Sequence, residues 1–412
     1  MQRNIRELEE KQKNALQRIS ELRAKIESYL QEKAKIPDGI SCWEEITQTQ
    51  KRLQEQFGIG EREWNDWHWQ IKNRVSTPQQ LSELISLNEQ QEQDVAAVCQ
   101  SYRFAISLYY LSLMGNTSAC PIRIQAIPSY QEISDTVGMI DPMAEESGSP
   151  VPAVVQRYPD RIIINVTNRC AMYCRHCQRR RLIGQRDSHS TINDLTAALE
   201  YVRQQKQIRD VLLTGGDALM LEDDLLDWLL TELERIPHVE IKRIGTRVPV
   251  TLPMRITDNL CQIMSRHLPL YLNTQFNHPL EITPAAAEAC LKLARSGVAL
   301  GNQSVLLAGV NDDVNIIKKL NQMLLTIMVR PYYLFHAKPV QGTQHFRTQV
   351  EKGIEIIRGL RGSTSGLAIP TFVVNAPGGL GKIALYPECI VEKNEGEIVL
   401  RTWEGKLIKY QS

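Results

Sequence analysis

Three cysteines lie close together at positions 170, 174 and 177, in the run NRCAMYCRHC that spans residues 168–177. The C-x3-C-x2-C spacing places three thiolates in one loop, one fewer than the four of a closed iron–sulfur site. A [4Fe–4S] cluster bound by three cysteines keeps one iron open to a small molecule. The run therefore predicts one-electron chemistry at a metal centre.

A zinc site is the alternative, and it would require a fourth ligand. His176 stands beside Cys177 and His189 follows it, so composition alone leaves zinc open. Residues 162–167 precede the cysteines as a short apolar run that predicts a buried strand. Metal-binding loops at the carboxyl ends of barrel strands are typical of catalysis, which favours the cluster over structural zinc or unliganded thiols.

Length, charge and cysteine usage restrict the class of protein. The chain has 412 residues and a formal net charge of +1, from 48 basic and 47 acidic side chains, so no basic excess favours binding to nucleic acid. It shows no signal peptide and no apolar run long enough to span a bilayer, which predicts a cytoplasmic, globular protein without membrane contact. The other cysteines have no pairing pattern and suit a reducing compartment: Cys42, Cys99, Cys120, Cys261, Cys290 and Cys389.

Three regions are predicted along the chain. Residues 1–155 are expected to form an N-terminal helical domain with a linker, residues 156–350 a partial barrel, and residues 351–412 a C-terminal segment that contains β-structure. Residues 136–160 are rich in Gly, Pro and Ser and predict the linker or a crossing loop. Residues 1–35 predict one long helix with an apolar stripe formed by Ile5, Leu8, Leu16, Ile19, Leu22, Ile26 and Leu30.

The middle region alternates β-rich runs with helical stretches, which is typical of a parallel α/β sheet or barrel. Its six β/α units predict a partial (β/α)6 barrel. The predicted strands are 162–167, 210–214, 241–246, 270–276, 299–306 and 329–335, and the predicted helices are about 191–206, 221–236, 255–267, 283–297 and 313–327. A further strand at 371–374 precedes a glycine-rich loop, and residues 396–411 predict a hairpin.

The second predicted strand ends in Gly215, Gly216 and Asp217. Two glycines allow the backbone to approach a ligand closely, and the aspartate offers an acceptor for a charged amine. An ordinary strand-to-helix turn would have the same composition, so the motif alone leaves both interpretations open. Gln303, on the fifth predicted strand, is a second candidate for the same ligand.

A glycine-rich loop over residues 375–382 ends in Lys382. A nucleotide phosphate loop would have glycine where Ala376 stands and Ser or Thr where Ile383 stands, so that interpretation fails at two positions. A lysine presented by a glycine turn suits Schiff-base formation with an aldehyde cofactor. A solvated surface lysine is the alternative.

Taken together, these motifs resemble the lysine 2,3-aminomutase family of radical S-adenosylmethionine (SAM) enzymes, which also use pyridoxal phosphate (PLP). The resemblance extends over most of the chain, from the WNDW run at residue 64 to the C-terminal hairpin. Besides the cysteine run, it is carried by RYPDR at 157–161, TGGD at 214–217, FNHP at 276–279, NQSVLL at 302–307, RPYY at 330–333 and APGG at 376–379.

The resemblance implies a role for individual residues. Cys170, Cys174 and Cys177 would bind the [4Fe–4S] cluster, and an external one-electron donor of the flavodoxin or ferredoxin type would reduce it. Arg179 would bind the substrate α-carboxylate. The resemblance further implies that Lys382 holds PLP as a Schiff base, that its phosphate lies near Arg157, Tyr158 and Arg161, and that SAM lies against Gly215, Gly216, Asp217 and Gln303.

Two positions depart from the lysine-specific members. Those enzymes hold the distant substrate ammonium with two aspartates, and the corresponding residues here are Lys338 and Asn375. A cation and a neutral amide would repel or leave unpaired an ammonium but would accept a carboxylate. The pair resembles the glutamate 2,3-aminomutase subgroup, and implies interconversion of L-glutamate and β-glutamate. Lysine or another amino acid, a protein-borne lysine, and a non-catalytic zinc scaffold remain alternatives.

The lysine enzymes also carry a subunit-joining zinc site with a cysteine-rich C-terminal tail and one cysteine from a barrel loop. Here Asp313 occupies that loop, and no cysteine-rich tail is present in the sequence. We therefore expect a homo-oligomer without structural zinc, assembled through other surfaces such as the N-terminal helix.

Overall fold

The computed structural model describes residues 2–411. For residues 2–6 and for Leu8 it describes the backbone alone, so Ile5 and Leu8 of the predicted stripe lie outside the described side chains. The chain divides into two compact units, Met1–Pro37 and Asp38–Ser412. No helix within the described part of the chain is both long enough and apolar enough to cross a membrane.

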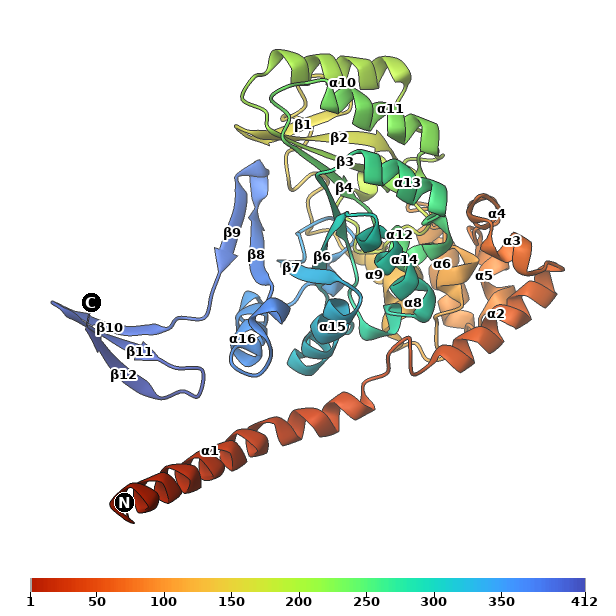
Figure 1. Cartoon of the computed structure of the whole chain (residues 1–412). Helices are drawn as coiled ribbons and strands as arrows, with labels where there is room; N and C mark the ends of the chain where they lie inside the picture. Colours follow the sequence, from red (N-terminus) through yellow and green to blue (C-terminus); the bar gives the residue numbers. More distant parts are fainter. Residues whose placement is uncertain (1, 412) are drawn as a thin grey trace. The chain divides into compact units, whose positions relative to one another are not determined.

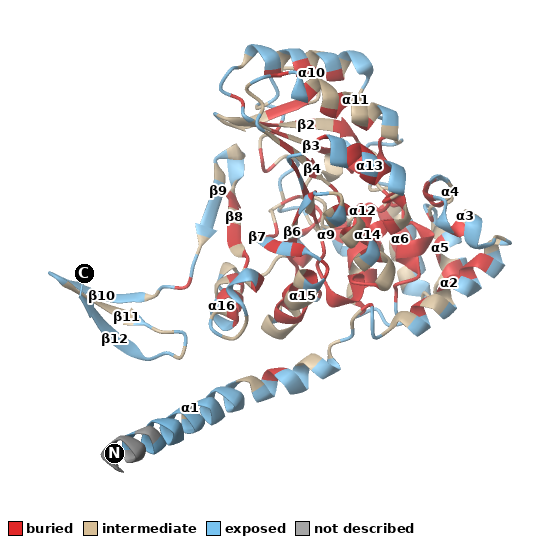
Figure 2. Ribbon diagram, in the orientation of Figure 1, coloured by how far each residue is buried: buried red, intermediate tan, exposed pale blue. Residues whose placement is uncertain are grey.

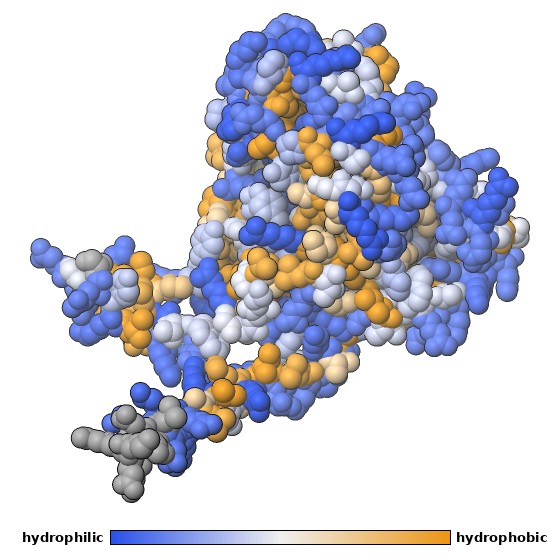
Figure 3. All heavy atoms as spheres, viewed as in Figure 1, coloured by the Kyte–Doolittle hydropathy of each residue, from blue (hydrophilic) through white to orange (hydrophobic). Residues whose placement is uncertain are grey.

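The first unit consists of one helix, α1 (Gln2–Lys35), as the periodicity predicts. Leu16, Ile19, Leu22 and Leu30 of its stripe are exposed. Figure 3 shows such apolar residues in orange along α1 among blue polar ones. The helix is therefore amphipathic.

The second unit is built on a nine-stranded sheet whose strands follow chain order (Figure 1). Neighbours from β2 to β8 are parallel, whereas β1 and β9 pair antiparallel at the two edges. The sheet is therefore an open barrel wound in one direction. Its strands are β1 (Val154–Tyr158), β2 (Arg161–Thr167), β3 (Asp210–Gly215), β4 (Ile241–Gly245), β5 (Leu270–Thr274), β6 (Ala299–Leu306), β7 (Val329–His336), β8 (Thr371–Ala376) and β9 (Gly381–Leu385).

Helices connect the parallel strands and complete six β/α units, which confirms the predicted α/β partial barrel. Their apolar residues recur at three- and four-residue steps, as Leu195, Ala198, Leu199 and Val202 do in α10, and bury one face. Figure 2 shows these helices red on one side and pale blue on the other. They are α10 (Ile192–Gln204), α11 (Asp223–Glu234), α12 (Val248–Thr251), α13 (Asp258–Arg266), α14 (Pro284–Arg295), α15 (Val314–Thr326) and α16 (Val350–Leu360).

Eight helices precede the sheet in the second unit, and all of them except the last, α9, contribute residues to its hydrophobic core. Trp64, Trp67 and Tyr110 belong to the same buried cluster as Ile164 of β2 and Leu272 of β5. The core therefore extends across the predicted boundary at residue 155, and the three-region division stays a prediction. The helices are α2 (Trp43–Phe57), α3 (Glu61–Asn65), α4 (Trp67–Lys72), α5 (Pro78–Leu84), α6 (Glu89–Cys99), α7 (Leu108–Leu111), α8 (Pro121–Ala126) and α9 (Gln131–Ser134).

One prediction at an edge of the nine-stranded sheet needs correction, and one in the separate three-stranded sheet at the C-terminus is extended. The proposed linker at 136–160 contains β1, and it buries Met143 and Glu145 rather than running over the surface. The proposed C-terminal hairpin is present as β11 (Glu397–Arg401) and β12 (Leu407–Gln411), but β10 (Ile390–Asn394) adds a third strand. Short, exposed or polar edge strands lack the apolar pattern that identified the central strands.

Candidate active site

The carboxyl ends of the parallel strands surround a cavity of about 280 Å3. Because parallel strands end at the same edge of a sheet, residues far apart in the sequence meet there. The lining includes every residue that the sequence assigned to the site except Tyr158 and Arg161: Arg157, Cys170, Cys174, Cys177, Arg179, Gly215, Gly216, Asp217, Gln303, Lys338, Asn375 and Lys382.

The three cysteines lie in a loop that is anchored on the N-terminal helices. Tyr173 donates its backbone N–H to the Ala105 carbonyl, and Arg175 forms a buried ion pair with Glu132 at 2.6 Å. Burial raises the pKa of the Cys170 and Cys177 thiols, so their thiolates require a nearby cationic centre. Three thiols facing one cavity fit a cluster with an open iron.

The two histidines that a zinc site could use have other contacts in the structure. His176 contacts the Gln275 side chain, Nε2 to Nε2 at 2.9 Å, and burial lowers its pKa. His189 forms a β-bridge with Thr167.

The glycine motif at the end of β3 packs against the cysteine loop. Gly215 has φ +123°, and a Cβ there would lie 2.4 Å from the Thr167 carbonyl oxygen. A Cβ on Gly216 would lie 2.6 Å from the Arg169 carbonyl oxygen. The two glycines therefore allow β2 and β3 to end in contact. Asp217 accepts hydrogen bonds from Thr246 Oγ1 at 2.6 Å and from the Arg247 backbone N–H at 2.6 Å.

Three arginines converge on one buried carboxylate, Glu145. Arg179 Nε lies 3.0 Å from both of its oxygens, Arg157 Nη2 lies 2.7 Å from Oε1, and Arg181 Nη2 lies 3.3 Å from Oε2. These cations hold the pKa of Glu145 below its ordinary value although burial opposes them. Glu145 therefore fixes one edge of the Arg179 guanidinium, while Arg179 still lines the cavity.

Two donors that line the cavity have no polar partner among the described residues. The Lys338 ammonium has no hydrogen bond or ion pair within residues 2–411 and lies 5.7 Å from the Phe335 ring centroid. Burial, followed by repulsion from Arg179 and Arg157, lowers the pKa of Lys338 to about 7. In the same part of the chain, buried Asn375 leaves Nδ2 unsatisfied. Both groups line the cavity, so a ligand with an acceptor would satisfy them.

Lys382 is the second residue of β9, shortly after a turn in which Gly378 and Gly379 have φ near +75°. Its backbone N–H donates to Tyr158 Oη at 3.0 Å, and the Arg161 guanidinium lies 4.0 Å from the Tyr158 ring centroid. Tyr158 and Arg161 therefore support the lysine from outside the cavity lining. Burial, with Arg243, Arg161 and Arg157, lowers the pKa of Lys382 to about 8, which favours a nucleophilic free amine.

Sequence reasoning missed two charged residues of the site, Glu145 and Arg247. Glu145 lies in the segment taken for a linker, where no periodicity singles out a buried acid. Arg247 follows β4 and lines the cavity. Its position after a predicted strand was the available signal, because the other motifs of the site occupy the same kind of position.

Comparisons with known proteins identify the family. Residues 164–320 match the model of the radical SAM superfamily, and residues 357–412 match that of lysine-2,3-aminomutase. A glutamate 2,3-aminomutase of Clostridioides difficile is 48% identical over 98% of this chain and 96% of its own length. An L-lysine 2,3-aminomutase of Clostridium subterminale is 48% identical over 85% of each chain. One from Bacillus subtilis is 47% identical over 85% of this chain and 75% of its own length. The chain therefore belongs to the lysine 2,3-aminomutase family of radical SAM enzymes, which are isomerases.

Proposed function

We propose that this enzyme is a glutamate 2,3-aminomutase, which moves the amino group between Cα and Cβ and so interconverts L-glutamate and β-glutamate. The observation that carries the proposal is the pair of unpartnered donors, Lys338 Nζ and Asn375 Nδ2, at positions where the lysine-specific relatives would carry aspartates. The glutamate enzyme of Clostridioides difficile matches nearly the whole chain and supports the same choice. Sequence identity alone does not decide the substrate, because this chain is also 48% identical to a lysine enzyme.

The charges of the cavity explain why a dicarboxylate suits it. Arg179 and Lys338 both line the cavity, and the repulsion between them contributes to the low pKa of the lysine. A lysine substrate would add a third cation beside Lys338, and burying an unpaired charge costs several kcal/mol. Glutamate instead brings two carboxylates, one for Arg179 and one for Lys338 and Asn375. Each carboxylate would neutralise a cation that is already buried.

The residues fit the cofactors that this family uses. Cys170, Cys174 and Cys177 would hold the [4Fe–4S] cluster, with SAM near the ends of β3 and β6, including Gly215, Gly216, Asp217 and Gln303. Lys382 would hold PLP, with its phosphate near Arg157, Tyr158 and Arg161. When bound, the cluster and SAM supply a carbon-centred radical, and PLP supplies a conjugated π-system across which the amino group migrates.

The protein's own part is binding, orientation and exclusion of water. Arg179, held along one edge by Glu145, orients the α-carboxylate. Lys338 and Asn375 fix the other end of the substrate, which aligns Cβ with the reacting groups. Lys382 Nζ, with its pKa of about 8, exchanges a proton near neutral pH when it joins or leaves PLP.

The setting of the enzyme is part of the proposal. All nine cysteines are free thiols, which suits the reducing cytoplasm. The one-electron donor would be a flavodoxin- or ferredoxin-like protein. The enzyme would work as a homo-oligomer that needs no structural zinc.

The deciding experiment is anaerobic incubation with SAM, PLP, a reductant and a panel of amino acids, scored for β-amino products. We expect turnover of L-glutamate and little or none of L-lysine. Comparable kcat/KM values for the two would refute the proposal. The double variant Lys338→Asp/Asn375→Asp should weaken glutamate turnover and admit lysine, whereas Lys393→Asp on the exposed strand β10 should leave both unchanged.

A further inference from the structure

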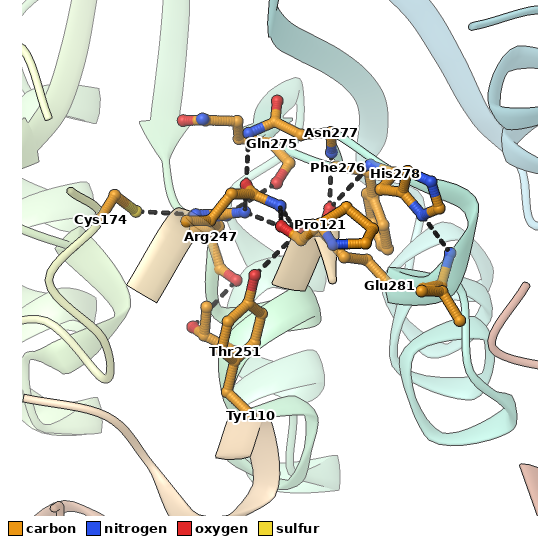
Figure 4. A network of polar contacts seen from close by, with 12 residues as sticks. Tyr110, Pro121, Cys174, Arg247, Thr251, Gln275, Phe276, Asn277, His278 and Glu281 are labelled. Atoms are coloured by element: carbon orange, nitrogen blue, oxygen red, sulfur yellow. Dashed lines mark hydrogen bonds and ion pairs between the residues drawn. The ribbon is translucent and has the colours of Figure 1, made fainter. Parts of the chain in front are cut away.

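Arg247 connects the cysteine loop to the buried core. Its Nη1 donates to Cys174 Sγ at 2.8 Å (Figure 4). Its Nη2 donates to Gln125 Oε1 at 2.6 Å and to Glu281 Oε1 at 2.7 Å, and its Nε donates to the Gln275 carbonyl at 3.1 Å. A single guanidinium therefore bridges a cysteine sulfur on one side and a buried carboxylate on the other.

The position of this guanidinium is fixed from several sides. Asp217 accepts the Arg247 backbone N–H at 2.6 Å, and the Thr251 hydroxyl donates to the Arg247 carbonyl at 3.1 Å. The Tyr110 ring centroid lies 5.7 Å from the guanidinium carbon. Arg247 is buried, and arginine keeps its charge at any physiological pH. The residue therefore places a permanent, immobile positive charge beside Cys174.

Glu281 balances that charge from the far side. It is fully buried, and its Oε1 accepts from the Tyr110 hydroxyl at 2.9 Å and from Gln125 Nε2 at 3.1 Å in addition to Arg247. Its Oε2 accepts the backbone N–H groups of Asn277 and His278 at 2.5 and 3.2 Å. Five hydrogen-bond donors hold this carboxylate in place. The ion pair thus forms a fixed dipole whose positive end points at the cysteine loop.

The three cysteines differ in what their sulfurs accept. Cys174 accepts from the charged guanidinium, and Cys177 accepts the Arg179 backbone N–H at 3.3 Å. Within residues 2–411, Cys170 Sγ accepts no hydrogen bond. Hydrogen bonds to sulfur and nearby charge are two of the factors that set the potential of an iron–sulfur cluster. A reduced cluster carries one more negative charge than an oxidised one, so a cation beside a thiolate favours the reduced form.

We propose that Arg247 raises the reduction potential of the cluster through Cys174, and that Glu281 limits this effect by neutralising part of the guanidinium charge. Arg247 acts through the Cys174 sulfur, to which it donates a hydrogen bond, and is a positioning residue rather than a ligand. The inference rests on the proposed binding of the cluster by the three cysteines and is independent of the amino-acid substrate. It assigns a task to Arg247, which follows β4 and has no role in the proposed function.

The test is an EPR-monitored redox titration of the reconstituted cluster in full-length protein, without amino-acid substrate. Arg247→Gln removes the charge and should lower the midpoint potential, by at least the 59 mV that corresponds to a tenfold change in a one-electron equilibrium. Glu281→Gln removes the opposing charge and should raise it. Arg247→Lys keeps the positive charge but cannot form all the hydrogen bonds of the guanidinium. Its midpoint potential should therefore lie between those of wild type and Arg247→Gln. Arg266→Gln, an exposed pair with Asp227, is the matched control and should not change the potential.

Opposite shifts distinguish electrostatic tuning from damage, because a purely structural role would not move the potential in two directions. Iron and sulfide content is measured on each variant first. If Arg247→Gln does not retain the cluster, the midpoint potential of Glu281→Gln alone tests the inference, since that variant keeps the guanidinium and all three cysteines. An unchanged or lowered potential in Glu281→Gln overturns the inference. Wild-type protein that binds no iron after reconstitution would instead refute the proposed cofactor site itself.

Discussion

The two ends of the cavity differ in whether their buried polar groups have partners. At the cluster end, formed by the cysteine loop and Arg247, the guanidinium is matched by Glu281 and by two further acceptors. At the substrate end, Lys338 and Asn375 lie beside Arg179, which is paired with Glu145. The described residues form no ion pair or hydrogen bond with the Lys338 ammonium, and they offer the Asn375 amide nitrogen no acceptor.

This difference distinguishes residues that hold the fold from residues that bind the substrate. A buried charge with its partners in place holds geometry, and its removal damages the fold. A buried donor without a partner weakens the fold and persists where a ligand supplies the missing acceptor. Substitutions at the cluster end should therefore act on stability and potential. Substitutions at the substrate end should act on binding, and in some cases should stabilise the ligand-free enzyme.

The largest effect is expected at Lys382, whose ammonium also has no ion pair within the described chain. Lys382→Ala removes the proposed attachment point for PLP and should lower kcat by about 10^3-fold or more. The measurement is turnover, together with mass spectrometry after borohydride reduction in the presence of PLP. One pyridoxyl group should be found on wild-type protein and on Lys393→Ala, and none on Lys382→Ala. Retention of the label in Lys382→Ala would place the cofactor elsewhere.

The next effect compares the two buried carboxylates. Glu281→Ala leaves the buried Arg247 guanidinium without its counter-charge and should lower the free energy of unfolding by about 4 kcal/mol. Glu145→Ala frees three arginines, two of which (Arg157 and Arg179) line the cavity, and should cost about 1 to 2 kcal/mol. Urea denaturation of the cofactor-free protein measures both. Equal losses would show that the two ends do not differ as described.

Periodicity predicted the parts of the fold that bury one face. The central strands β2 to β8 and the helices α10, α11, α13, α14 and α15 agree with the predicted segments to within a few residues, whereas α12 and α16 were not predicted. The strands β1, β9 and β10 were not predicted, because they lie at sheet edges or on the surface, where no alternation of apolar residues is required. Tertiary pairing alone, such as the register of Val154 with Ile164, identifies them.

The candidate site was predictable where a short motif carries it. The cysteine run and the glycine loop before Lys382 point to their chemistry from local spacing. Glu145 and Arg247 were not predictable in this way, because each depends on a contact with a residue 34 positions further along the chain. Glu145 pairs with Arg179, and Arg247 pairs with Glu281, and only the folded chain creates these contacts. Lys338 and Asn375 drew attention only through the resemblance to a family.

Lys338 should give a pH-dependent effect at the substrate end. Its pKa of about 7 means that the free enzyme loses the ammonium as pH rises through neutrality, and only the charged form attracts a carboxylate. The KM for glutamate should therefore rise with pH above 7. Lys338→Met should raise KM by about 30-fold, equivalent to about 2 kcal/mol, and abolish this pH dependence. A KM that is independent of pH between 6 and 9 in wild type would contradict the assignment.

The same shift predicts an effect on stability. The folded-state pKa of Lys338 lies below the unfolded value of about 10.4, so the folded chain binds fewer protons between pH 7 and 10. The contribution of Lys338 to stability therefore increases with pH across that window. Removing the buried cation in Lys338→Met should stabilise the ligand-free protein by about 1 kcal/mol at pH 7. Thermal unfolding of wild type and Lys338→Met with and without glutamate checks both effects: the variant should be more stable without ligand and less stabilised by glutamate.

The smallest effect is expected at Asn375, which contributes a neutral donor. Asn375→Ala removes one hydrogen bond to the substrate side chain and should raise KM for glutamate about fivefold, or about 1 kcal/mol, with little change in kcat. The backbone pairing of residue 375 with Lys382 does not involve the side chain, so PLP attachment should persist. Stability without ligand should stay equal or rise, because the variant no longer buries an unsatisfied amide. Steady-state kinetics and urea denaturation check the two results, with the exposed Asn394→Ala as control. A loss of stability at unchanged KM would assign Asn375 to the fold, and the substrate end would then rest on Lys338 alone.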